Sequence, residues 1–171
     1  MRILAAILFT FLGLTPLYAA DQFEEMLSRQ AAIDKFVWEA PLFIKDKSLT
    51  ALRKLAPLKF EEVYEKPNPH VPGENIEYKG LDFDGLSIFG EVKNQSELAP
   101  IHIIITDKRW QILKELNVGT NIERIEQVLG KATYEYGNTK EVKEYKGETN
   151  SIIFHTEDTS IKKIELVYYA D

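Results

Sequence analysis

Three histidines, His70, His102 and His155, are the side chains best suited to acid–base or metal chemistry. No two of them form a short-spaced pair such as H-x-x-x-H, so a zinc site would need distant strands and carboxylates to assemble it. His70 lies in a Pro-rich segment that is typical of a loop, and the other two lie in segments typical of strands. This pattern favours structural roles for all three, and we expect no bound metal ion and no cofactor.

Carboxylates are plentiful, but their spacing does not indicate a catalytic pair. Glu61-Glu62 and Asp82-Phe83-Asp84 lie where a strand edge or a turn is commonly acidic. Hydrolysis by paired carboxylates needs two such groups close together in a cleft, which this spacing neither forbids nor favours. The sequence has no Gly-x-Ser-x-Gly elbow, Walker loop or G-x-G-x-x-G motif. We expect no catalytic residues and no enzyme activity. The alternative is a small envelope hydrolase that uses carboxylates with His102 or His155.

Aromatic and aliphatic residues suggest a recognition surface instead. Residues 161–169 alternate so that both sides of a strand carry apolar groups, although a helix can cover only one side. A bare sheet face with such residues suits protein docking, because aromatic side chains bring large contact area at low ordering cost. The predicted partner-binding residues are Tyr78, Ile105, Trp110, Tyr145 and Tyr169, with Tyr78 equivalent to Tyr145 and Ile105 to Tyr169 on one concave face. The alternative is that these side chains fill a core.

The first 19 residues predict export. Arg2 provides a short positive segment, and residues 3–14 are apolar but too few to span a bilayer. Pro16 precedes a small residue, Ala19, after which we expect cleavage. No Cys follows for lipid attachment, so we expect a periplasmic or secreted protein without stable membrane insertion.

Composition narrows the class of partner. The chain has 21 Lys+Arg and 27 Asp+Glu, a net charge of −6, and loss of Arg2 with the signal leaves 20 against 27, or −7. Nucleic acid and anionic lipid are therefore poor partners, and we expect an envelope or secreted protein instead. The absence of cysteine excludes disulfides, zinc-thiolate sites and thiol catalysis, so stability must come from packing.

The elements that must position these residues follow the same order in both halves of the chain. In the first half we expect helices over residues 21–31 and 48–56, a loop over 67–73, a hairpin over 76–92 that turns at Asp84-Gly85, and an interior strand over 101–106. In the second half we expect a helix from Ile122 to Leu129 with a Thr120–Glu123 capping box and Gly130 as its C-terminal cap, followed by strands over 134–145, 151–156 and 161–169.

Local matches between the halves predict a tandem duplication. Leu49, Leu52 and Leu55 precede Ile122, Ile125 and Val128 by 73 residues, Tyr78-Lys79-Gly80 recurs as Tyr145-Lys146-Gly147, and residues 103–107 correspond to 167–171. We therefore expect a signal peptide (1–19), an N-terminal helix and linker (20–40), a first module (41–107) and a second module (108–171). The alternative is a single α+β domain whose short strands look alike.

The segment from Leu116 to Ala132 resembles the short strand, Gly-Ser/Thr, helix and Leu-Gly-x-Pro opening of exported modules typified by the SmpA/OmlA outer-membrane lipoproteins. The beta-lactamase inhibitor protein resembles two such modules in tandem. Ala132 replaces the usual Pro, and both the lipid-attachment Cys and the inhibitor's cysteines are absent. The resemblance implies an α+β fold of two helix-plus-antiparallel-meander modules, whose strands can form one curved sheet with helices on one face. It also implies a non-catalytic protein-binding module of the inhibitor, immunity or envelope-assembly type.

Overall fold

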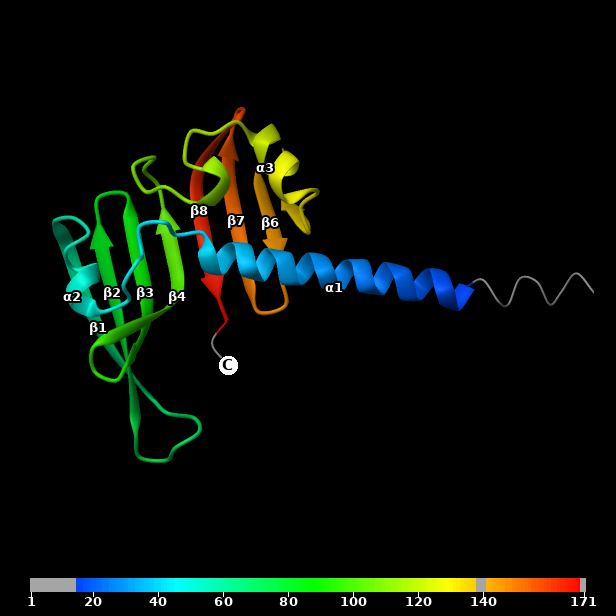
Figure 1. Cartoon of the computed structure of the whole chain (residues 1–171). Coiled ribbons are helices and arrows are strands. Elements are labelled where there is room, and N and C mark those ends of the chain that lie inside the picture. Colours follow the sequence, from blue (N-terminus) through cyan, green and yellow to red (C-terminus); the bar gives the residue numbers. More distant parts are fainter. Residues whose placement is uncertain (1–14, 138–140, 170–171) are drawn as a thin grey trace, which may run out of the picture.

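A single antiparallel sheet with helices on one of its faces forms the fold (Figure 1). The computed structural model describes residues 15–137 and 141–169; most of the predicted signal peptide lies outside these residues. The sheet has eight strands in the order β1-β2-β3-β4-β8-β7-β6-β5, and every neighbouring pair is antiparallel. The expected α+β class and the continuous sheet are confirmed.

The two halves of the chain each contribute four consecutive strands. The first half contains α1 (Thr15–Glu39), α2 (Leu49–Leu52), β1 (Leu58–Pro67), β2 (Asn75–Phe83), β3 (Leu86–Lys93) and β4 (Glu97–Ile105). The second half contains the 3-10 helix η1 (Leu113–Glu115), α3 (Ile122–Leu129), β5 (Tyr134–Tyr136), β6 (Val142–Lys146), β7 (Asn150–Glu157) and β8 (Ser160–Tyr168). Strands β4 and β8 join the halves through four residue pairs, from His102 with Val167 to Ile105 with Ile164.

One face of the sheet packs on the helices and forms the core. Alternate strand residues on this face are almost fully buried together with apolar residues of α1, α2 and α3, as the strict period of two in a strand predicts. Core members include Ile33, Val37, Leu52, Leu81, Ile88, Ile103, Ile125, Ile152 and Leu166. The opposite face carries none of the described helices, and we call it the open face. Its residues include Tyr64, Tyr78, Phe89, His102, Ile104, Glu165, Ile153, His155 and Tyr136.

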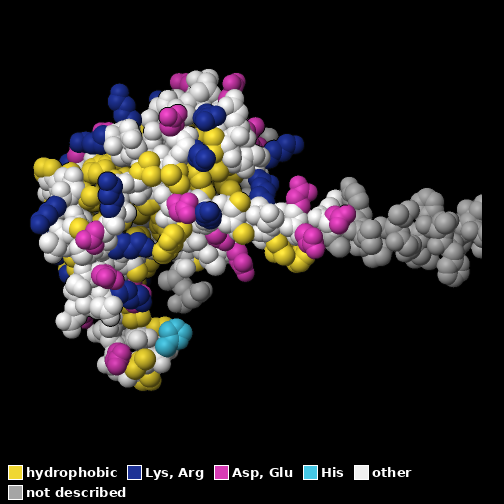
Figure 2. All heavy atoms as spheres, viewed as in Figure 1, with side chains coloured by type: hydrophobic (Ala, Val, Ile, Leu, Met, Phe, Trp, Pro, Cys, Tyr) yellow, Lys and Arg dark blue, Asp and Glu magenta, His cyan; other side chains and the backbone are white. Residues whose placement is uncertain are grey.

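The N-terminal half of helix α1 projects away from the sheet, and its C-terminal half lies across the helix-covered face (Figure 1). Its last turns contact β6 and β7, and the hydroxyl of Tyr168 in β8 donates to the carbonyl of Val37 at 3.2 Å. The outward half stands clear of the body, with acidic and hydrophobic side chains at its surface (Figure 2). Phe23, Met26 and Leu27 are all exposed there. The helix is therefore longer than the predicted 21–31 segment.

Most of the expected turns and caps are present, with one correction. Gly85 turns the β2–β3 hairpin at φ 68°, and Gly130 caps α3 at φ 75°. The predicted capping box is wrong, because Asn121 rather than Thr120 is the N-cap and accepts the backbone N–H of Glu123 at 2.8 Å. The carbonyl of Thr120 instead accepts the N–H of Ile161, so the chain enters the helix one residue later.

Both halves attach the helix that precedes their strands in the same way. The N-cap residue of α2, Ser48, forms an isolated bridge with Glu97, and the N-cap residue of α3, Asn121, forms one with Ser160. Each bridge lies at the first residue of the last strand of its half, β4 or β8. The flanking bonds also match: Leu49 N–H to Ser96 O and Leu98 N–H to Lys47 O in the first half, Ile122 N–H to Thr159 O and Ile161 N–H to Thr120 O in the second.

Candidate functional site

Aromatic side chains occupy both ends of the open face. On β1 to β3, the ring of Phe89 stacks on Tyr78 with centroids 5.8 Å apart and meets the edge of Tyr64 at 6.2 Å. On β5, Tyr134 and Tyr136 stack at 6.1 Å, and about half of each side chain is exposed. Both ends therefore offer ring surface that packs partly on itself and partly faces solvent.

A hydrogen-bonded cluster of His102, Glu165 and His155 lies at the centre of this face. Glu165 in β8 is flanked by β4 and β7, and the sheet register sets one histidine diagonally on each side of it. The Nε2 atom of His102 lies 2.8 Å from Glu165 Oε2, and the Nε2 atom of His155 lies 2.6 Å from Oε1. Lys163 Nζ is 2.8 Å from the same Oε1. One carboxylate thus serves three nitrogen donors.

The protonation of the cluster follows from these contacts. An ionised carboxylate only accepts hydrogen bonds, so each imidazole donates through Nε2–H and keeps Nδ1 as an acceptor when neutral. Burial raises the pKa of Glu165, but the hydrogen bonds from Lys163, His102 and His155 outweigh burial and lower the pKa to about 2. The open face therefore carries an ionised carboxylate at its centre, paired with the ammonium group of Lys163.

The cluster is arranged for hydrogen bonding on a surface. Among residues 15–137 and 141–169, no group of three or more His, Cys, Asp and Glu side chains is placed to hold a metal ion. Both Nε2 atoms are already bonded to the carboxylate. The two imidazoles are about one-third exposed, at 34% and 30%, and lie on a sheet surface.

The predicted partner-binding residues do not share one surface. Tyr78 lies on the open face, and Tyr169, 51% exposed, follows the end of β8. Ile105, Trp110 and Tyr145 are buried in the core, which corrects their expected exposure.

The physical reason for this correction is strand alternation. Ile105 and Tyr145 occupy strand positions that point toward the helices, since a shift of one residue reverses the face. The hydroxyl of Tyr145 donates to Gly130 O at 3.1 Å, next to α3. Trp110 follows β4, donates Nε1–H to Asp84 O at 2.9 Å and packs on Phe43. Tyr78 and Tyr145 therefore lie on opposite faces.

Sequence reasoning missed Glu165, Phe89, Tyr64 and the two tyrosines of β5 as open-face residues. A signal for Glu165 was present, because Lys163 and Glu165 alternate with the apolar Ile164 and Leu166 in one strand. No comparable signal marks β1 and β5, whose residues are mostly exposed.

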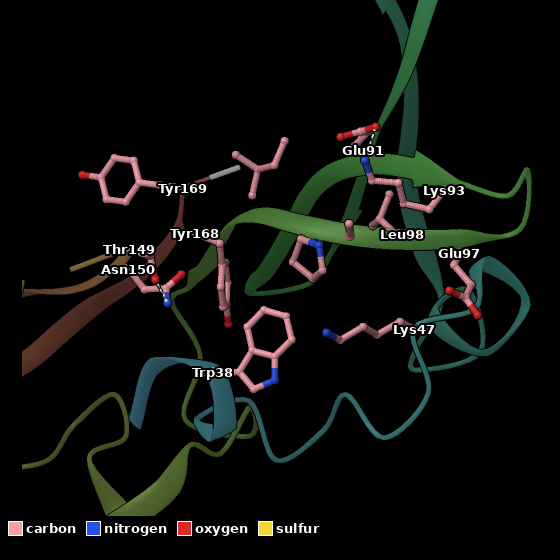
Figure 3. A pocket seen from close by; sticks show the side chains of 13 residues that line it. Trp38, Lys47, Glu91, Lys93, Glu97, Leu98, Thr149, Asn150, Tyr168 and Tyr169 are labelled. Carbon is pink, nitrogen blue, oxygen red and sulfur yellow. Dashed lines mark hydrogen bonds and ion pairs between the residues drawn. The ribbon is translucent and has the colours of Figure 1, made fainter. Parts of the chain in front are cut away.

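A groove of about 520 Å³ lies between β4 and β8, beyond the His102–Val167 pair at the end of their paired segment. Trp38 and Tyr168 both line this groove and pack edge to face, with ring centroids 6.0 Å apart. Lys47 Nζ lies 3.8 Å from the centroid of the Trp38 ring (Figure 3). Burial lowers the pKa of Lys47, an effect that Glu97 opposes. Tyr169 also lines this groove (Figure 3), but its ring is not part of the Trp38–Tyr168 pair; instead the ring centroid lies 5.8 Å from Lys146 Nζ.

Within the described residues, no helix is both long enough and apolar enough to cross a membrane. Comparisons of the chain with protein-family models, with curated proteins and with solved structures gave no match.

Proposed function

We propose that this chain is an exported, non-catalytic protein-binding module that docks an envelope or secreted protein through its open face. The observation that carries this proposal is the combination on one helix-free sheet surface of aromatic clusters at both ends and a charged cluster at the centre. Tyrosine is enriched among the few residues that carry most of the binding energy of protein interfaces, and charged groups select the orientation of the partner. An inhibitor, an immunity factor and an assembly accessory all need such a surface.

We also infer that the chain consists of two related modules, residues 41–107 and 108–171. The matching bridges of Ser48 with Glu97 and Asn121 with Ser160 support this inference, as do the nearly identical N-cap backbone angles, φ −63° and ψ 138° against φ −64° and ψ 138°. The two bridges align β4 of the first half with β8 of the second half at a sequence offset of 63 residues, from Glu97 to Ser160. In this alignment Ile105 corresponds to Tyr168. Both of those side chains are buried. The resemblance to tandem modules of the SmpA/OmlA and beta-lactamase inhibitor type agrees with this inference.

The docking proposal is tested by two neighbouring residues of β1 that point to opposite faces. Tyr64 is on the open face and 45% exposed, whereas Val63 is on the other face and 57% exposed. The mature chain, residues 20–171, serves as bait in envelope extract, and the captured protein is then titrated against each variant. We expect Tyr64→Ala and Tyr136→Ala to weaken binding by about 1–3 kcal/mol each and Val63→Ala to leave it unchanged. Equal binding by all three variants would overturn the proposal.

A small hydrolase is the second candidate, favoured by the convergence of His102 and His155 on Glu165. A carboxylate that orients an imidazole leaves the other ring nitrogen free to act as a general base. Ser151, whose buried hydroxyl has no hydrogen-bond partner among the described residues, is separated from His102 by Val167 in the sheet. Hydrolysis of p-nitrophenyl acetate that falls at least about 100-fold in Glu165→Gln would favour this candidate. An unchanged background rate favours docking.

A further inference from the structure

We propose that a groove on the β1–β3 part of the open face receives an arginine side chain of the protein partner. This inference rests on the proposed docking function and names the chemistry that the partner must present. The groove has a volume of about 360 Å³ and borders the histidine cluster, because its lining residue Phe89 on β3 pairs directly with His102 on β4. Its lining includes Glu62, Tyr64, Gly80, Asp82, Ser87 and Phe89.

Gly80 forms the floor of this groove. It lies in the interior of β2, directly opposite Glu62 on one side and Phe89 on the other. A Cβ atom placed on Gly80 would lie 3.8 Å from Glu62 Cγ and 4.0 Å from Phe89 Cδ2. Since a glycine inside a strand often marks the close approach of another group, its missing side chain leaves room between a carboxylate arm and an aromatic ring.

Two half-buried carboxylates border this space without a cation. Glu62 faces Gly80 across the strands, and Asp82 is the next residue of β2 on the same face. Neither has an ion pair or hydrogen bond in the described part of the chain, whereas their neighbours do: Glu61 with Arg53, Glu77 with Lys79, and Asp84 with Lys59. A cation from outside the chain is therefore the complementary group for these two carboxylates.

The aromatic walls favour arginine over other cations. A guanidinium group is planar, stacks on aromatic rings and binds carboxylates through a fixed fork of donors. Tyr64 and Phe89 supply ring surface beside the carboxylates. Lys66, two residues beyond Tyr64 on β1, also lines the groove. Its ammonium group, however, lies 5.6 Å from the ring centroid of Tyr78 and has no ion pair with either carboxylate in the described part of the chain. The carboxylates therefore remain available to a partner's side chain.

The direct test uses N-acetyl-L-argininamide as the probe and N-acetyl-L-citrullinamide as its neutral isostere, each titrated into the isotopically labelled mature chain and followed by NMR. We expect saturable shifts of the backbone amides of Glu62, Gly80 and Phe89 with the arginine compound and an affinity at least about tenfold weaker with the citrulline compound. The Glu62→Gln/Asp82→Asn variant is expected to lose about tenfold in affinity for the arginine compound. Glu74→Gln/Glu148→Gln, which makes the same change in net charge at exposed turn positions, is expected to retain it.

A third variant, Gly80→Ala, fills part of the groove without disturbing the fold. The added methyl group makes only ordinary van der Waals contacts and Gly80 has no positive φ, so the variant is expected to fold with unchanged stability and bind the arginine compound several-fold more weakly. Equal affinity for the two probes, or equal loss in the groove and control variants, overturns the inference. Capture of the protein partner distinguishes this inference from the docking function. If Tyr136→Ala abolishes capture and Glu62→Gln/Asp82→Asn does not affect it, the arginine inference is overturned and the docking function stands. If neither variant affects capture, the arginine inference and the docking function are both overturned.

Discussion

Asp34 in α1 accepts the backbone N–H of Asn150 through Oδ1 at 2.7 Å, although the two residues are 116 positions apart. The same carboxylate accepts the backbone N–H groups of Glu148 at 2.8 Å and Thr149 at 3.2 Å. Consecutive N–H groups that converge in this way form an anion-binding concavity, here in the turn between β6 and β7. This one side chain therefore adds a polar anchor to the apolar packing that holds the helix on the sheet.

Replacing Asp34 with alanine is expected to destabilise the protein by about 2–4 kcal/mol, because three backbone donors and the Asn150 amide lose a charged acceptor. Urea unfolding of the mature chain measures the effect. Glu25→Ala removes one negative charge from an exposed position of the same helix and serves as the control. A loss no larger than that of the control would contradict the anchoring role of Asp34.

Gly147 is expected to be required only because Asp34 lies above it. A Cβ atom at Gly147 would lie 2.3 Å from Asp34 Oδ1, which is far inside van der Waals contact. Gly147→Ala should therefore destabilise the wild-type chain and cost much less in an Asp34→Ala background. A double-mutant cycle measured by urea unfolding gives this coupling. Additive losses would show that the two residues act independently.

The sequence contained enough local signal to predict the second-half helix, the Gly85 turn and the antiparallel strand around residues 101–106. These features depend on residues close together in the chain, such as Gly85 with its positive φ and the apolar run that ends at Ile105. Strand β1 was not predicted. It lies at the edge of the sheet and most of its residues are exposed, so it has no apolar face to give a period of two.

The site was harder to predict than the fold, because it depends on register. His102 and Glu165 are 63 residues apart and meet only because β4 pairs with β8 through Ile104 opposite Glu165. Tyr145 shows the opposite problem: its strand was predicted, but local sequence does not say which alternate positions face the helices when both carry apolar groups. In the folded chain, the partly buried hydrogen bond from its hydroxyl to Gly130 O holds Tyr145 on the helix-covered face.

Tyr145 and Tyr169 should respond to mutation in opposite ways. Tyr145 is fully buried, and burial raises its pKa to about 12. We expect Tyr145→Ala to cost about 3–5 kcal/mol through cavity formation and Tyr145→Phe about 1 kcal/mol through loss of the bond to Gly130. Tyr169→Ala should change stability by less than about 0.5 kcal/mol, because the side chain is half exposed. Thermal unfolding of the three variants tests these values, and a marginal effect of Tyr145→Ala would contradict its place in the core.

The central carboxylate should make the stability of the folded protein depend on pH. Burial raises the pKa of Glu165, yet the hydrogen bonds from Lys163, His102 and His155 bring it from the ordinary 4.5 down to about 2. A carboxyl group whose pKa is lower in the folded than in the unfolded state binds fewer protons when folded. Its stabilising contribution is therefore complete above about pH 5 and is lost as the pH falls from 4.5 toward 2.

Glu165→Gln should accordingly be less stable than wild type at pH 7, and the difference in unfolding free energy should shrink as the pH is lowered through this window. Glu74→Gln removes the same charge from an exposed turn and is the matched control against which the pH trend is compared. Urea unfolding at several values between pH 7 and pH 2.5 gives the curves. If the two variants follow parallel curves, the three donors do not stabilise the Glu165 carboxylate, and the carboxylate at the centre of the open face does not have the lowered pKa assigned to it.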